Sequence, residues 1–205
     1  MIQEASPTLE EFQGHEGCNE ILNITRPDII AGIHAQYLKS GAEAIETNTF
    51  GANFANLAEY GIEDRIEELA YAGARVAREV ADDFYTDEKP RWVLGSMGPG
   101  TKLPTLGHTT YDNLKQTFAL QAKGLIAGGA DAFMVETSQD LLQTKAAINA
   151  CRLAIVEAGV RLPIFVEVTV ETTGTMLLGS EIGAALTALE PLGIDMIGLN
   201  CATGP

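Results

Sequence analysis

An amide and a thiol follow a short apolar segment at the end of this sequence. Asn200 and Cys201 come directly after residues 195–199, which are mostly apolar and are preceded by Gly193. Such a segment is typical of a strand buried on both faces, and Gly204-Pro205 then reads as a turn. A cysteine at a strand end is a candidate metal ligand or nucleophile, although a lone cysteine is more often a small buried residue.

Four other apolar segments also end in polar side chains. Parallel strands of α/β folds bring their carboxyl ends, and the ligands that bind there, to one edge of the sheet. We therefore treat these side chains as candidates for contact with a ligand. They are Glu46 and Asn48, Ser96, Glu136, and Glu167 with Thr169.

The elements that must position these side chains alternate between helix and strand patterns. Thr25 is predicted to cap a helix that has Pro27 in its first turn and ends at Gly41, because both residue types favour helix starts. Repeated βα units of this size predict a parallel sheet. We expect strands at residues 44–47, 92–95, 132–135, 164–168 and 195–199, and further helices at 63–84, 111–127, 140–157 and 181–189.

Two α/β architectures compete for this pattern. A doubly wound sheet concentrates its site at one switch point, whereas a TIM barrel takes site residues from the ends of many strands. Polar residues at every strand end favour the barrel. A complete barrel has eight strands over about 250 residues, so the five segments found here predict an incomplete TIM barrel, with residues 1–205 as one partial domain.

Charge and composition argue against several partners. The formal net charge is −15, whereas nucleic acid and anionic membranes bind clustered Lys and Arg. Three cysteines without CxxC spacing predict no disulfide framework and favour a reducing compartment. The sequence shows neither a signal-peptide pattern nor an apolar run of about 18 residues, so we expect a cytoplasmic protein without a membrane span.

Five stretches together resemble one protein family. The sequence is similar to the homocysteine-binding N-terminal domain of cobalamin-dependent methionine synthases, and the likeness covers nearly the whole chain. The combination of stretches is far more specific than any one short motif. They are residues 43–51, 95–105, 135–137, 169–180 and 198–205, the last of which contains a Gly-Leu-Asn-Cys motif ending at Cys201.

The resemblance implies a TIM barrel that holds a zinc ion through three cysteines. Cys201 matches one of them, whereas the other two form an adjacent pair in a Gly-Gly-Cys-Cys motif that this sequence lacks. The family's first strand, with an Asp-Gly-Ala-Met-Gly-Thr motif, is also missing. We therefore expect strands two to six of the barrel, truncated at both ends, and no stoichiometric zinc on this chain alone.

The chemistry that the resemblance implies is methyl transfer to sulfur. In the family, homocysteine binds zinc as a thiolate and attacks the methyl group of methylcobalamin, which lies on a separate domain, to give methionine. The implied cofactors are zinc and methylcobalamin. The implied partners are homocysteine and the cobalamin-binding and folate-binding domains of the full-length enzyme, and we expect the chain alone to be inactive.

The resemblance also suggests substrate contacts. Glu136 matches the carboxylate that holds the amino group of homocysteine, and a carboxylate suits this cationic group. Asn200 and Asn48 are further candidates for substrate binding. Asn200 could instead orient its loop, and Asn48, like Glu46, could support the pocket wall. We assign no catalytic residue in this chain.

The remaining reactive side chains are predicted to be structural. His34 is expected within a helix, Cys151 in the core, and Cys18 in a loop as a weak candidate for a second zinc ligand. Two other functions stay open at this point. One is a different homocysteine or thiol S-methyltransferase of the same superfamily, and the other is a non-catalytic truncated fragment.

Overall fold

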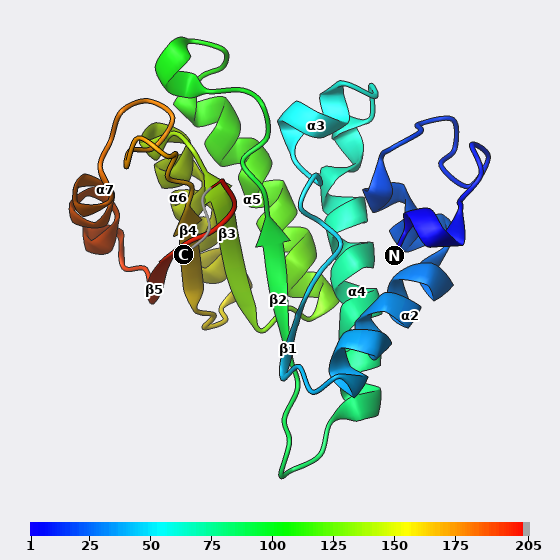
Figure 1. The fold of residues 1–205 in the computed structure, drawn as a ribbon. Coiled ribbons are helices and arrows are strands. Elements are labelled where there is room, and N and C mark those ends of the chain that lie inside the picture. Colours follow the sequence, from blue (N-terminus) through cyan, green and yellow to red (C-terminus); the bar gives the residue numbers. More distant parts are fainter. Residues whose placement is uncertain (203–205) are drawn as a thin grey trace.

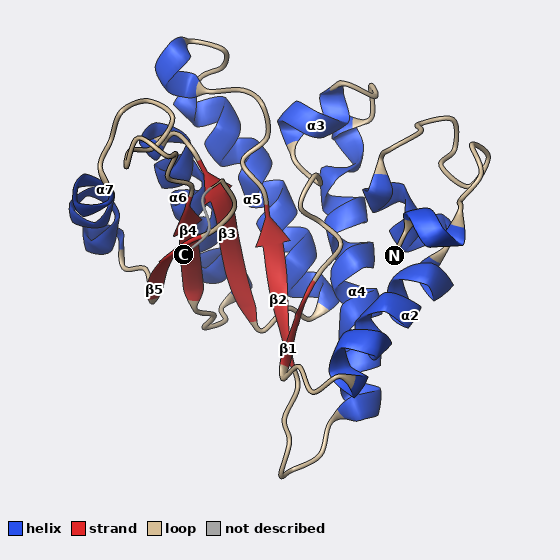
Figure 2. Ribbon diagram, in the orientation of Figure 1, coloured by secondary structure: helices blue, strands red, loops and turns tan. Residues whose placement is uncertain are grey.

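Five parallel strands form a single sheet in the computed structural model, which describes residues 1–202. The strands follow one another across the sheet in chain order, and every neighbouring pair is parallel (Figure 2). This order, with a helix between successive strands, is that of part of a (β/α)8 barrel, as the sequence predicted. The strands are β1 (Ala44–Glu46), β2 (Trp92–Met97), β3 (Ala132–Ser138), β4 (Ile164–Val168) and β5 (Met196–Leu199).

The helices gather on one side of this sheet. In Figure 1, α4, α5 and α6 lie behind the strands, and no helix of residues 1–202 covers the opposite face. No helix over these residues is long and apolar enough to cross a membrane. The helices are α1 (Leu22–Thr25), α2 (Pro27–Lys39), α3 (Phe54–Ala58), α4 (Ile66–Phe84), α5 (Tyr111–Gly128), α6 (Leu141–Ala158) and α7 (Ile182–Leu189). Short 3-10 turns occur at Gln3–Ala5, Asn19–Ile21, Glu63–Arg65, Pro104–Leu106 and Glu190–Leu192.

Local sequence explains where the long helices start and stop. Asp140 caps α6, since its Oδ1 accepts the backbone N–H of Leu142 at 2.8 Å, as N-cap carboxylates commonly do. Gly159, with a φ of 67°, ends the same helix. The predicted cap of α2 is wrong: Thr25 instead ends α1, and its hydroxyl donates to the carbonyl of Glu11 at 2.6 Å.

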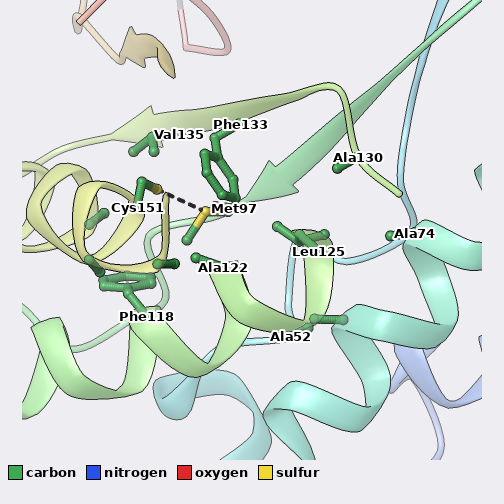
Figure 3. Close-up of a cluster of buried hydrophobic side chains, with 14 of the residues drawn as sticks. Ala52, Ala74, Met97, Phe118, Ala122, Leu125, Ala130, Phe133, Val135 and Cys151 are labelled. Carbon is green, nitrogen blue, oxygen red and sulfur yellow. Dashed lines mark hydrogen bonds between the residues drawn. The ribbon is translucent and has the colours of Figure 1, made fainter. Parts of the chain in front are cut away.

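The hydrophobic core lies between the sheet and the helices. Alternate strand residues point to opposite faces, and those that point to the helices are buried, among them Val93, Phe133, Val135, Ile164 and Val166. Figure 3 shows Phe133 and Val135 beside Met97 and the α5 side chains Phe118, Ala122 and Leu125. Cys151 is fully buried here with its Sγ 3.5 Å from the sulfur of Met97, so its predicted place in the core is confirmed.

Helices α4 and α5 approach each other closely at a glycine. A Cβ atom on Gly124 of α5 would lie only 2.4 Å from the backbone oxygen of Glu67 on α4. Real Cβ atoms do not come this close to a carbonyl oxygen, so any side chain at this position would force the two helices apart. The glycine thus allows α4 and α5 to pack closely side by side.

The last strand is not buried as predicted. Met196 and Leu199 of β5 are 39% and 59% exposed, because β5 pairs with β4 alone and lies at an edge of the sheet. An apolar sequence shows that a strand can be buried on both faces, but burial also needs neighbours on both sides. The predicted turn at Gly204-Pro205 lies outside the described residues.

Candidate functional site

The site begins with a buried hydroxyl network between the ends of β1 and β2. The Thr47 hydroxyl accepts the backbone N–H of Ser96 at 3.0 Å, and the Thr49 hydroxyl donates to the Ser96 carbonyl at 2.7 Å. Gln121 of α5 donates from below to the carbonyl of Thr49 at 2.8 Å. These bonds fix the backbone of Ser96. Its hydroxyl points to the face of the sheet opposite the helices, which we call the open face.

The Ser96 hydroxyl forms a hydrogen bond with Glu136. Ser96 donates to Glu136 Oε1 at 2.6 Å, and the side-chain amide of Asn200 donates to Oε2 at 3.4 Å. Burial raises the pKa of Glu136, while the Ser96 hydrogen bond opposes this effect. The two hydrogen bonds fix the position of the Glu136 side chain, and its oxygens keep acceptor capacity for a cationic ligand.

A β-bulge places this carboxylate. The pairing of β3 with β4 shifts register between Val135 and Ser138, and Thr137 within the bulge has a φ of 57°. A β-branched residue rarely adopts a positive φ, and bulges are frequent beside active sites, where they re-aim side chains. Thr137 was missed by the sequence reasoning, because nothing in its residue type signals a left-handed backbone.

Asn200 uses its amide within the protein. Its Oδ1 accepts the N–H of Thr137 at 3.0 Å, and its Nδ2 donates to the hydroxyl of Thr137, also at 3.0 Å. Together with the longer bond to Glu136, these contacts connect the end of β5 to the end of β3. Contacts of this kind suit the role of orienting the loop, and the predicted substrate contact of Asn200 stays a prediction.

Cys201 lies at the surface next to these residues. The residue is exposed, and its Sγ is 3.6 Å from the hydroxyl of Thr137. Like Thr137, Cys201 has a positive φ, here 56°, a conformation that costs free energy and clusters at functional sites. The structure thus brings Cys201, Asn200 and Glu136 together, as expected for three strand-end residues of a parallel sheet.

The described residues do not complete a zinc site. Within residues 1–202, no group of three or more His, Cys, Asp or Glu side chains could hold a metal ion. A zinc site requires at least three protein ligands, and Cys201 provides one soft donor. Cys18 adds nothing, because it is buried and its thiol donates to Glu20 at 3.7 Å. Burial raises the pKa of the Cys18 thiol to about 12, which disfavours the thiolate that zinc binds.

Asn48 lies farther along the open face. Its amide donates to the carbonyl of Asn19 at 2.8 Å and to Oδ1 of Asn23 at 2.9 Å, so it anchors the N-terminal segment. Asn48 also lines a hollow of about 540 Å³ beside β1. Polar lining comes from His34, Glu46, Thr47, Asn48, Ser96 and Glu136, and apolar lining from residues that include Ile2, Ile30, Ile33 and Phe50.

The arrangement of sheet and site is that of a barrel enzyme that binds its ligand at the carboxyl ends of the strands. The homocysteine methyltransferase MmuM from Escherichia coli has a similar fold. Its apo form matches 96% of this chain and 70% of its own with a TM-score of 0.70 at 17% identity. Its oxidized form matches 90% and 83% with a TM-score of 0.60 at 16% identity. At such identities the likeness shows the fold alone.

The family is shown by the sequence comparisons. The homocysteine S-methyltransferase family matches residues 1–205, and this chain belongs to that family, as the resemblance implied. Two similar curated proteins are the methionine synthases of Mycobacterium tuberculosis (strain ATCC 25618 / H37Rv) and Mycobacterium leprae (strain TN), which are 61% and 60% identical over 204 residues. Each alignment covers 100% of this chain but 17% of the relative.

Proposed function

We propose that this chain is the homocysteine-binding part of a methionine synthase. In this role it binds homocysteine so that the substrate's sulfur accepts a methyl group from methylcobalamin carried on another domain. The observation that carries the proposal is the fixed Glu136 carboxylate, held by Ser96 and Asn200 beside the exposed thiol of Cys201. The high identity to two methionine synthases supports the choice of this family member.

The residues divide the work by their chemistry. Glu136 binds the ammonium group of homocysteine, since a carboxylate and an ammonium form a charge-assisted hydrogen bond. Asn200 holds Glu136 and Thr137 in register, and Asn48 supports the wall of the adjacent hollow. Cys201 is a soft donor of the kind that zinc binds, and a complete zinc site needs further ligands from outside the described residues.

The remaining parts of the reaction lie elsewhere in the longer protein. The cobalamin-binding and folate-binding domains are the partners of this chain in the proposal, because the chain spans only 17% of the length of its methionine synthase relatives. Three free cysteines, Cys18, Cys151 and Cys201, are consistent with work in the reducing cytoplasm. No step of methyl transfer itself is assigned to residues of this chain.

The proposal is tested by ligand binding. Calorimetry should detect L-homocysteine and L-methionine on the chain, and Glu136→Gln should weaken both by about tenfold or more, as expected for a hydrogen bond between charged groups. Glu43→Gln is a matched control, because Glu43 is an exposed glutamate at the opposite end of β1. Equal affinity of the Glu136→Gln variant and the wild type would reject Glu136 as the ammonium site.

A further inference from the structure

Three carboxylates share the open face of the sheet. Glu46, Glu136 and Glu167 come from β1, β3 and β4. Each of them is adjacent in sequence to residues that point to the helical layer, such as Ile45, Val135 and Val166, so strand alternation directs the three carboxylates away from the helices. Within residues 1–202 none of the three forms an ion pair with Lys or Arg.

Glu46 and Glu167 are affected by the negative charge of neighbouring carboxylates. Burial, followed by the charges of Glu136 and Glu167, raises the pKa of Glu46 to about 7. Burial and then the charge of Glu136 raise the pKa of Glu167. Neighbouring carboxylates with no cation between them resist full ionisation, and they titrate as a coupled set. At neutral pH Glu46 therefore retains part of a proton that an isolated glutamate would have lost.

An unpartnered histidine lines the hollow that contains Glu46 and Glu136. His34 of α2 is 6% exposed, and its Nε2 is shielded from solvent without a hydrogen-bond partner among the described residues. Burial lowers the pKa of His34 to about 4, so its ring is neutral at pH 7 and does not balance the carboxylates. Tyr37 is the other titratable α2 residue at this hollow. A buried polar atom without a partner calls for a ligand or an ordered group nearby.

We propose that Glu46 and Glu167 act together with Glu136 as one cation-binding group for the ammonium of the substrate. This inference rests on the proposed function, in which Glu136 alone is assigned to that ammonium. On binding, the ammonium enters, and the fraction of a proton that Glu46 holds at neutral pH leaves to solvent. The entering ammonium neutralises more of the negative charge on this face than the departing proton did, and a thiol compound without an amino group cannot provide this neutralisation.

The first test measures the protonation of Glu46 in the chain without ligand. Carboxyl ¹³C NMR of glutamate-labelled protein should show Glu46 titrating near neutral pH. Glu136→Gln and Glu167→Gln should each move this titration toward the ordinary value, because each removes a neighbouring negative charge. Glu43→Gln should leave it unmoved. Ordinary titration of Glu46 in the wild type, or a titration that neither substitution moves, would overturn the proposal.

The second test measures the exchange, with L-methionine as the probe because it has an ammonium group and no thiol proton. Calorimetry at pH 7 in buffers of different ionisation enthalpy should reveal proton release on binding. Glu46→Gln should abolish that release and weaken binding about three- to tenfold at pH 8, where the wild-type carboxylate is charged.

The outcomes separate this inference from the proposed function. Loss of methionine binding in Glu136→Gln, with binding and proton release unchanged in Glu46→Gln and Glu167→Gln, would overturn the three-carboxylate group and leave Glu136 as the ammonium site. Absence of methionine binding to the wild-type chain would overturn both. Weaker binding in all three glutamine variants, with release lost in Glu46→Gln, is the result that we expect.

Discussion

Strands β3 and β5 have similar sequence patterns but differ in how deeply they are buried. Both are short apolar segments that follow a glycine and an acidic residue and end in a polar site residue. β3 lies between β2 and β4, and its residues 132–135 are all buried. β5 has a neighbour on one side, and its outer surface forms an apolar hollow of about 250 Å³ with α7, lined by residues that include Ile182, Leu186 and Leu199.

This difference divides the site into a firmly held half and a lightly held half. Glu136 extends from a strand with hydrogen-bonded neighbours on both sides and a bulge that fixes its direction. Cys201 follows a strand that only β4 supports, and the Asn200 amide provides its further connection to β3. The Glu136 carboxylate is thus positioned by the core, whereas the Cys201 thiol depends on local polar contacts.

The largest expected effect is a difference in unfolding free energy between truncations of buried β3 and of exposed β5. Phe133→Ala on β3 should lower the free energy of unfolding by about 3–5 kcal/mol, because it empties a fully buried aromatic site. Leu199→Ala on β5 should cost about 1 kcal/mol or less, since most of this side chain is already in water. Denaturant unfolding of the two variants measures both values, and equal losses would show that β5 is as well packed as β3.

A smaller effect is expected from the connection between the strands. Asn200→Ala should lower the free energy of unfolding by about 1–2 kcal/mol, because the partly buried N–H of Thr137 loses its acceptor. Asn113→Ala on α5, which removes a single side-chain bond to Thr109, is the control and should cost less. Amide exchange of β5 should accelerate in Asn200→Ala. Unchanged exchange there would mean that β4 pairing alone holds the strand.

The smallest expected effect concerns pH. The pKa of Glu46 is about 7 in the folded chain, above its ordinary value of 4.5, so the folded state binds the proton more tightly than the unfolded state. The stability from this proton is complete below pH 4.5 and is lost as pH rises to 7. Glu46→Gln should therefore melt higher than the wild type at pH 8, by about 2 °C or less, because solvent screens a carboxyl group that is only partly buried. The advantage should disappear at pH 4.5, and an equal gain at both pH values would contradict the assigned cause.

Much of this molecule could be predicted from its sequence because the signals are local. The apolar runs and their terminal glycines indicated the βα order, and the motifs ending at Glu136 and Cys201 indicated which strand ends meet. Burial of β5 was mispredicted because exposure depends on which strands pair beside it. The helix cap at Thr25 was also mispredicted, because the threonine hydroxyl bonds to a distant carbonyl that the sequence does not reveal.

Within the site, the missed features are those of backbone geometry. The positive φ of Thr137 and the register shift of β3 arise from the pairing with β4. The use of the Asn200 amide by Thr137 follows from that bulge. Residue types could name candidates for substrate contact, but they could not show which polar groups were already satisfied inside the protein.

We propose above that Glu136, on the well-packed strand β3, binds the ammonium group of homocysteine. The most direct measurement is a crystal structure of the chain with bound L-homocysteine. We expect the substrate nitrogen within hydrogen-bond distance of the Glu136 carboxylate, roughly 2.7–3.2 Å, and the substrate sulfur on the Cys201 side. A substrate nitrogen bound away from Glu136, or the substrate carboxylate in its place, would show that Glu136 is not the ammonium site.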